Sequence, residues 1–94
     1  MKNKDNKVEV NASNKIILNT YAEVLLEGET FNIEIVNLPS GYTRDDIRYT
    51  SSDTSVAVVD NGTIKALKVG SSKINVHTSD NKYNTYINIL VSTG

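Results

Sequence analysis

One histidine and a set of aspartates are the residues of this chain that could carry chemistry. His77 is the single histidine, and the sequence has no cysteine to serve as a thiolate nucleophile or metal ligand. A Ser-His-Asp arrangement would need His77 to meet a serine and an aspartate in a pocket. The alternation of Ile74 and Val76 instead places His77 on the solvent face of a strand, beside Asn75. The sequence therefore predicts no catalytic residues, no cofactor and no enzyme activity.

The acidic side chains fall in predicted loops. They are Asp45, Asp46, Asp53, Asp60 and Asp80. Loop aspartates most often cap turns, which is the preferred interpretation. The alternative is a calcium site built from two loops at one end of the fold by Asp45, Asp46, Asp53 and Asp80, since calcium prefers oxygen ligands. No spacing among them resembles an organised calcium loop.

Tyrosine is the main aromatic residue, with five tyrosines, one phenylalanine and no tryptophan. Tyr49 is predicted to lie in the core. Tyr21, Tyr42, Tyr83 and Tyr86 fall in loops or at strand edges, where tyrosines often cover the ends of a core. Alternatively, Tyr42, Tyr83 and Tyr86 form a surface that stacks on sugar rings or anchors a protein partner.

Length and charge limit the kinds of protein this chain can be. Its 94 residues correspond to one domain. Ten basic and eleven acidic residues are scattered along it, so the net charge of −1 gives no reason to expect a nucleic-acid or anionic-membrane partner. There is no run of roughly 20 apolar residues, and the start lacks the apolar stretch of a signal peptide. Residues 1–14 are predicted to form a flexible polar lead-in and residues 15–94 the domain.

A hairpin organises the middle of the chain. Two apolar runs, Val56–Val59 and Thr63–Val69, flank Asp60-Asn61-Gly62, whose residues tolerate positive φ. A type I′ turn there sets the register, so that Ala57 and Val59 face the same side as Ile64 and Ala66. A third strand is expected to follow the break at Gly70.

Alternating apolar residues predict the remaining strands. A first strand, broken at Thr20-Tyr21, switches between sheets, and Thr30–Val36 is the clearest half-buried strand. Ile47–Ser51 and Tyr83–Val91 alternate in the same way. The predicted fold is all-β, an immunoglobulin-like antiparallel β-sandwich of about seven strands. The predicted core residues are Phe31, Ile33, Ile35, Tyr49, Val59, Ile64, Ile74, Val76, Ile87 and Ile89.

The same stretch carries a family resemblance. The residues concerned are Ser51-Ser52-Asp53, Val56-Ala57, Val59, Gly62, Ile64, Ala66, Gly70 and Ile74. Together they resemble the signature of group 2 bacterial immunoglobulin-like domains, which are modules of intimin- and invasin-like surface proteins and of phage structural proteins. The resemblance extends from about Ile16 to Val91, with Tyr49 where the family usually has tryptophan.

The resemblance implies a non-catalytic structural or spacer module of a larger bacterial cell-surface or virion protein. Its expected partners are neighbouring domains of the same parent protein, and the isolated domain is expected to be monomeric. Outward-leaning Val36, Val58, Tyr86 and Leu90 are expected to form a mild apolar patch for such a neighbour. The alternative is an adhesin-type binding module that recognises a host protein or carbohydrate through loops or an edge strand.

Overall fold

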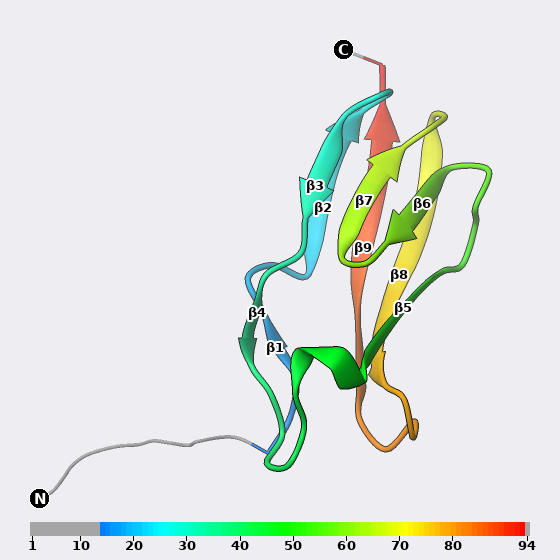
Figure 1. Ribbon diagram of the computed structural model, residues 1–94. Coiled ribbons are helices and arrows are strands. Elements are labelled where there is room, and N and C mark those ends of the chain that lie inside the picture. Colours follow the sequence, from blue (N-terminus) through cyan, green and yellow to red (C-terminus); the bar gives the residue numbers. More distant parts are fainter. Residues whose placement is uncertain (1–13, 94) are drawn as a thin grey trace, which may run out of the picture.

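The computed structural model describes residues 14–93, so nearly all of the predicted lead-in lies outside the described residues. These residues form nine strands and one turn of 3₁₀ helix (Figure 1). The elements are β1 (Ile17–Leu18), β2 (Ala22–Leu26), β3 (Thr30–Asn32), β4 (Ile35–Asn37), η2 (Arg44–Asp46), β5 (Ile47–Ser51), β6 (Ala57–Asp60), β7 (Thr63–Ala66), β8 (Gly70–Thr78) and β9 (Asn84–Ser92).

The strands form two facing layers. One layer is a four-stranded sheet in the order β2-β9-β8-β5. The other consists of the three-stranded sheet β3-β7-β6 and the separate pair β1-β4, which lies toward the opposite end (Figure 1). The prediction of an all-β sandwich is confirmed. Within residues 14–93, no helix has the length and apolar character needed to cross a membrane.

The predicted central hairpin is present as β6 and β7. Val59 pairs with Ile64 and Ala57 with Ala66, as the turn residues predict. Asn61 and Gly62 have φ values of 49° and 88°, the left-handed conformation that a type I′ turn requires at both central positions. Local turn chemistry therefore sets this register.

The first predicted strand switches sheets where expected. Before the break, Leu18 on β1 pairs with Ile35 on β4; after it, Val24 on β2 pairs with Leu90 on β9. The β2–β9 pairing is parallel, whereas the sequence predicts antiparallel pairing throughout. The chain crosses between layers without reversing direction, so β2 lies alongside β9 with the same orientation.

The prediction of one continuous strand over Thr30–Val36 is wrong. The backbone N–H of Ile33 donates to the carbonyl of Gly62 at 2.8 Å, at the turn where β7 begins. From Glu34 onward the partner changes, because the N–H of Glu34 donates to Asn19 Oδ1 at 3.0 Å. β3 thus pairs with β7 and β4 with β1. Splits of this kind account for the larger number of strands.

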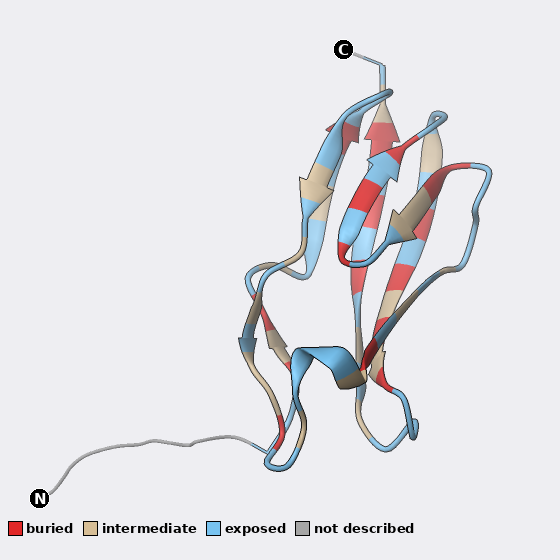
Figure 2. Ribbon diagram, viewed as in Figure 1, coloured by how far each residue is buried: buried red, intermediate tan, exposed pale blue. Residues whose placement is uncertain are grey.

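Buried residues lie on strands of both layers (Figure 2), and their apolar side chains form one core cluster. Among the predicted core residues, Ile64, Ile74, Val76, Ile87 and Ile89 are buried, whereas Phe31, Ile33, Ile35, Tyr49 and Val59 are partly buried and pack against the core. The other buried apolar residues are Ile16, Leu18, Leu25, Ile47, Val56, Ala57, Ala66 and Val91. The first strands contribute more to the core than predicted.

Replacing Ile87 by alanine tests the core. Ile87 is 0 % exposed, so Ile87→Ala should lower the free energy of unfolding by about 2 to 5 kcal/mol. Val36→Ala is the matched control, since Val36 is 66 % exposed and its loss should cost less than about 0.5 kcal/mol. Urea denaturation followed by circular dichroism measures both. Equal shifts in the two midpoints would contradict the assigned facing of these strands.

Gly70 is a second test of the packing. It has a φ of +151°, and a Cβ built there would lie 2.8 Å from Val56 Cγ2, whose side chain is buried. Gly28 has a φ of +89° and nothing within 4 Å, so Gly28→Ala should cost only the backbone strain of about 1–2 kcal/mol. Gly70→Ala should cost more, because Val56 must also move. Thermal unfolding of the two variants compares them, and the opposite order would refute the close contact.

Candidate functional site

A hydrogen-bonded network closes the end of the molecule where residue 14 lies, here called the N-terminal pole. Thr78 is fully buried, and its Oγ1 donates to Asp80 Oδ1 at 2.6 Å. The same carboxylate oxygen accepts the N–H of Lys82 at 3.0 Å. Tyr83 N–H donates to Thr78 Oγ1 at 3.2 Å. Asp80 therefore organises the turn between β8 and β9.

Two of the three tyrosines predicted as a partner surface meet at this pole. Tyr42 donates its hydroxyl hydrogen to Asp80 Oδ2 at 2.5 Å. The rings of Tyr42 and Tyr83 pack edge to face, with centroids 5.5 Å apart and planes at 78°. Asn14 Nδ2 donates to the Tyr83 hydroxyl, while Asn14 Oδ1 accepts the N–H of Ser40, both at 3.1 Å. Asn14 is thus part of the folded domain, one residue earlier than predicted.

The network fixes the charge of its two titratable groups. Hydrogen bonds from Thr78 and Tyr42 lower the pKa of Asp80 to about 2. The hydrogen bond to Asp80, and then burial, raise the pKa of Tyr42 to about 12. Around neutral pH the carboxylate is charged and the phenol is neutral. A general acid or base needs a pKa near the working pH, so this pair is suited to holding the pole together.

Two other loop aspartates, Asp46 and Asp53, also cap turns with their carboxylates. Asp46 Oδ2 accepts the N–H of Thr43 at 2.9 Å, at the start of η2. Asp53 Oδ1 accepts the N–H of Ser55 at 3.0 Å and also its hydroxyl, and these bonds lower the pKa of Asp53. The carbonyl of Asp45 accepts a hydrogen bond from Arg48 at 2.7 Å. Across residues 14–93, no three His, Cys, Asp or Glu side chains come together in a group that could hold a metal ion.

His77 lies on the outer face of the four-stranded sheet, in register with Arg48 on β5 and Asn84 on β9. The ring is partly buried, and Nδ1 lies 3.0 Å from the carbonyl oxygen of Thr78. This nitrogen therefore contacts the backbone of the next residue on the same strand. The placement agrees with the predicted outward facing.

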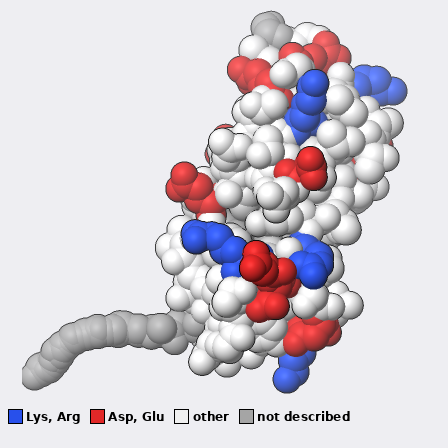
Figure 3. Space-filling model, viewed as in Figure 1, with Lys and Arg blue, Asp and Glu red and all other residues white. Residues whose placement is uncertain are grey.

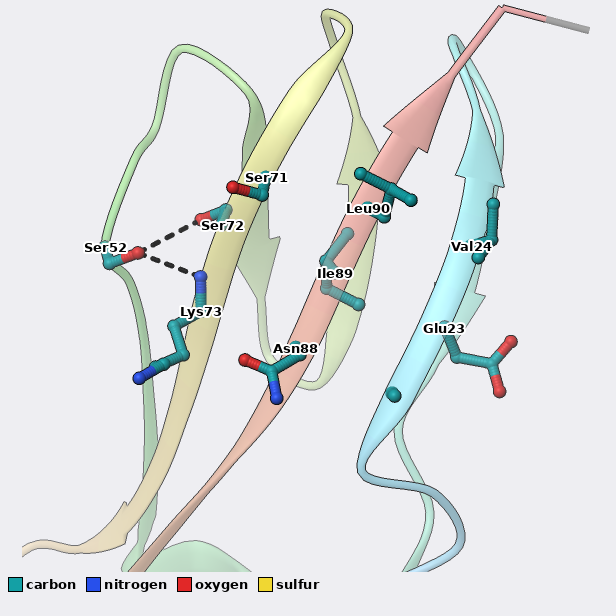
Figure 4. Close-up of a pocket in the computed structure, with 10 residues that line it drawn as sticks. Glu23, Val24, Ser52, Ser71, Ser72, Lys73, Asn88, Ile89 and Leu90 are labelled. Carbon is teal, nitrogen blue, oxygen red and sulfur yellow. Dashed lines mark hydrogen bonds between the residues drawn. The ribbon is translucent and has the colours of Figure 1, made fainter.

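The same outer face carries a groove of about 680 Å³ (Figure 4). It is lined by Ala22, Glu23, Val24, Ser52, Ser71, Ser72, Lys73, Asn88, Ile89 and Leu90. Small side chains at Ala22 and Ser71 leave the hollow, and Val24 and Leu90 form its apolar side. At the β8 margin of the groove, Ser52 Oγ accepts the N–H of Lys73 at 2.8 Å (Figure 4). The groove offers hydroxyl and amide groups on one side and aliphatic carbon on the other.

Tyr86, the third predicted partner tyrosine, lies on this face, away from Tyr42 and Tyr83. Its ring is 44 % exposed, and Lys73 Nζ lies 4.4 Å from the ring centroid, a cation–π contact. The groove was not predicted from the sequence. The alternation of Val24 with Leu25 indicates an outward apolar residue there, but the neighbouring strand that completes the face could not be identified from sequence.

A second hollow of about 500 Å³ lies where β3 gives way to β4. Its lining residues are Ile33, Glu34, Ile35, Arg44, Asp45, Tyr49, Asn61 and Gly62. Arg44 Nη2 donates to the carbonyl of Ile35 at 3.3 Å, which ties η2 to β4. Burial raises the pKa of the adjacent Tyr49, so its hydroxyl stays neutral. This polar hollow results from the break in the second layer.

Comparison with known families identifies the family to which the chain belongs. The family model of the hyaluronate lyase N-terminal beta-sheet domain matches residues 42–89, just over half of the chain. The chain belongs to this family. The matched part includes η2, β5 to β8 and most of β9. The predicted resemblance is thus supported for a β-sandwich module, while this match is to the lyase N-terminal domain family rather than to group 2 immunoglobulin-like domains.

Two kinds of relative are similar to this chain. An uncharacterized protein of Clostridium acetobutylicum is 40 % identical over 78 residues, which are 81 % of this chain and 20 % of that protein. Structures of the S-layer protein SbsC are similar in fold. Its domains 4 and 5 give a TM-score of 0.69 at 14 % identity over 92 % of this chain and 56 % of theirs. Its domains 5–6 give 0.70 at 14 % identity over 85 % and 44 %. The chain thus spans about a fifth of the curated relative's length.

The polar network at the N-terminal pole predicts a specific acid response. The pKa of Asp80 is about 2 in the folded chain, below its ordinary value of 3.8. The stability it contributes is therefore present above about pH 4 and is lost as the pH falls toward 2. Asp80→Asn should melt at a lower temperature at neutral pH, and its melting temperature should fall less than that of the wild type on acidification. Asp45→Asn is the control for loss of one charge outside the network. Parallel melting curves for Asp80→Asn and wild type across this pH range would refute the role.

Proposed function

We propose that this domain is a non-catalytic structural module of a longer bacterial cell-surface protein, where it spaces or supports other domains. One observation carries the proposal: the two ends of the described chain lie at opposite ends of the molecule (Figure 1). The molecule measures 50 × 28 × 15 Å along its principal axes, so modules joined end to end would form a rod.

Both ends are connected to the body of the sandwich. At the N-terminal pole, Asn14 bonds to Ser40 and Tyr83. At the other end, here called the C-terminal pole, the carbonyl of Ser92 accepts the N–H of Glu27 at 3.3 Å. β9, which leads to this pole, is paired with β2 on one side and β8 on the other. Tension along the long axis would therefore load two ladders in shear.

The relatives support the module interpretation. The matching family is described as an N-terminal domain, and the SbsC structures are described as sets of consecutive domains. The resemblance to group 2 immunoglobulin-like domains of surface and phage proteins adds to this support. As proposed, the partners are neighbouring domains of the same polypeptide, without nucleic acid or membrane insertion, and the isolated domain is a monomer located at the cell surface or in a virion.

A second candidate function is an adhesin-type binding module for a host protein or carbohydrate. The groove on the outer face favours it, because Lys73, Asn88 and Ser71 offer polar groups beside Val24 and Leu90. A glycan array and a cell-binding assay with the 94-residue chain test this function. Binding that Asn88→Ala abolishes would favour the adhesin.

Mechanical pulling tests the structural function. The chain is held by single cysteines introduced at Lys15 and Thr93, near its two ends, and unfolded in an optical trap or by atomic force microscopy. We expect high resistance, since the ladders of β9 must shear together. The control pulls the same chain between Ser40 and Lys82, both at the N-terminal pole, where strands can be peeled apart one bond at a time. Equal, low forces in the two geometries would contradict a load-bearing spacer.

A further inference from the structure

Four exposed aliphatic residues come together on the outer face of the four-stranded sheet, next to the C-terminal pole. Val24 on β2 is the register partner of Leu90 on β9, and Leu26 is the partner of Ser92. Val69 directly precedes Gly70, which pairs with Val91, and its N–H donates to Glu27 Oε2 at 3.3 Å, in the turn that follows Leu26. The exposed fractions are 64 % for Val24, 51 % for Leu90, 48 % for Val69 and 40 % for Leu26. These four residues are called the C-terminal patch.

Polar and charged residues border the C-terminal patch. Ser71 is the register partner of Leu90, and Asn88 pairs with Ala22 in the next row. Lys73 also lies in the next row, in register with Asn88. At the pole, Glu27 Oε2 accepts the N–H of Val69 at 3.3 Å and Glu29 Oε1 accepts that of Leu26 at 2.8 Å. Scattered exposed aliphatic residues are normal, but a contiguous cluster with a polar rim is typical of an interface, whose centre is apolar. The predicted patch of Val36, Val58, Tyr86 and Leu90 is not this surface, because Val36 and Val58 belong to the other layer.

The size of the C-terminal patch limits its partner. Three strands about 4.8 Å apart and two rows of side chains give an area of roughly 200 Å². A stable interface between free proteins needs about 800 Å² on each side. A partner tethered to the same chain needs much less contact, because tethering supplies an effective concentration in the millimolar range. The area therefore fits a covalently linked neighbour.

The position of the end of β9 determines which neighbouring domain would be tethered beside the C-terminal patch. β9 ends at Ser92, the register partner of Leu26, so anything joined after Gly94 starts beside the patch. The chain's own Val8 and Val10 are attached at the other pole, within six residues of Asn14. At about 3.5 Å per residue they reach roughly 20 Å from Asn14, whereas the long axis measures 50 Å. They cannot cover the patch.

The charges of the two poles favour head-to-tail contact. Glu27 and Glu29 lie in the turn between β2 and β3 at the C-terminal pole, and Figure 3 shows acidic side chains gathered at that end with basic side chains beside them. Lys68, the residue before Val69, is also exposed. At the N-terminal pole Lys15 and Lys82 are exposed. The carboxylate of Asp80 is hydrogen-bonded within that pole, as those of Glu27 and Glu29 are within theirs. A second copy arriving by its N-terminal pole would bring lysines to the glutamates.

We propose that the C-terminal patch seats the next module of the same polypeptide, a second copy of this chain joined after Gly94, with the N-terminal pole of that copy against Glu27 and Glu29. The inference rests on the proposed function as a module of a longer protein. It adds that the joint between modules is a fixed contact, so the rod is stiff at this point.

The test is a tandem protein of two copies of residues 1–94, with only the first copy isotopically labelled. We expect the amide resonances of Val24, Val69 and Leu90 to differ from those of the single chain, and the first copy to tumble with the correlation time of the whole tandem. Val24→Ser with Leu90→Ser in the first copy should abolish both effects. Val36→Ser is the matched control, because Val36 is 66 % exposed on the other layer.

Each outcome decides the proposal. If the patch resonances are identical to those of the single chain and the two modules tumble independently, the proposed contact is wrong. The proposed spacer function is unaffected by that result. Shifts at the patch that grow with the concentration of the single chain would show a free dimer and overturn the tethered joint. Val69→Ser alone, which changes a residue beside the β7–β8 turn, should weaken the contact without touching β2 or β9. Failure of the pulling test would count against the spacer function independently of these spectra.

Discussion

The pairing of β9 on both sides is the constraint on which the rest of the structure depends. On one side it forms an eight-pair antiparallel ladder with β8, from Gly70 paired with Val91 to His77 paired with Asn84. On the other side five residues pair in parallel with β2. With both edges occupied, β9 is restricted to one register, and its alternation then directs Ile87, Ile89 and Val91 inward. The inner face, the outer groove and the C-terminal patch all follow from this register.

The second layer is less continuous. Because the chain changes partner between β3 and β4, the layer consists of a three-stranded sheet and a separate two-stranded pair. The polar hollow at Tyr49 and Arg44 lies at this junction. Two hydrogen bonds between Asn19 and Glu34 and the bond from Ile33 to Gly62 join the pieces. The two parts of this layer are thus held together by packing on the four-stranded sheet and by these hydrogen bonds, rather than by one continuous ladder.

The sequence predicts what is local and misses what depends on the partner strand. Asn61-Gly62 defines a turn by its own backbone preferences, so the register of the hairpin could be predicted. The inward facing of Ile33 and Ile35 followed from alternation, which is a property of a single strand. Which strand lies alongside is a property of two distant segments, so the split after Asn32 and the parallel pairing of β2 could not be predicted.

The same distinction applies to the candidate site. Tyr42, Tyr83 and Asp80 were individually recognisable as loop residues, but their contact depends on how two loops from distant parts of the chain meet at one pole. The groove and the C-terminal patch combine residues of β2, β8 and β9, so neither is visible in any single stretch of sequence. A thin sandwich whose interior is filled by side chains such as Ile64 and Ile74 leaves its poles and outer faces for interactions.

The two poles differ in chemistry, and this difference gives the domain a direction. The N-terminal pole is closed by a polar network around Thr78 and Asp80, which satisfies its own hydrogen-bonding groups. The C-terminal pole adjoins exposed aliphatic side chains and two glutamates. Two copies of one pole would bring like surfaces together, whereas opposite poles are complementary. Head-to-tail contacts use two different surfaces and do not close on themselves unless a rotation makes a ring. This difference between the poles supports the proposal of a linear array over a symmetric dimer.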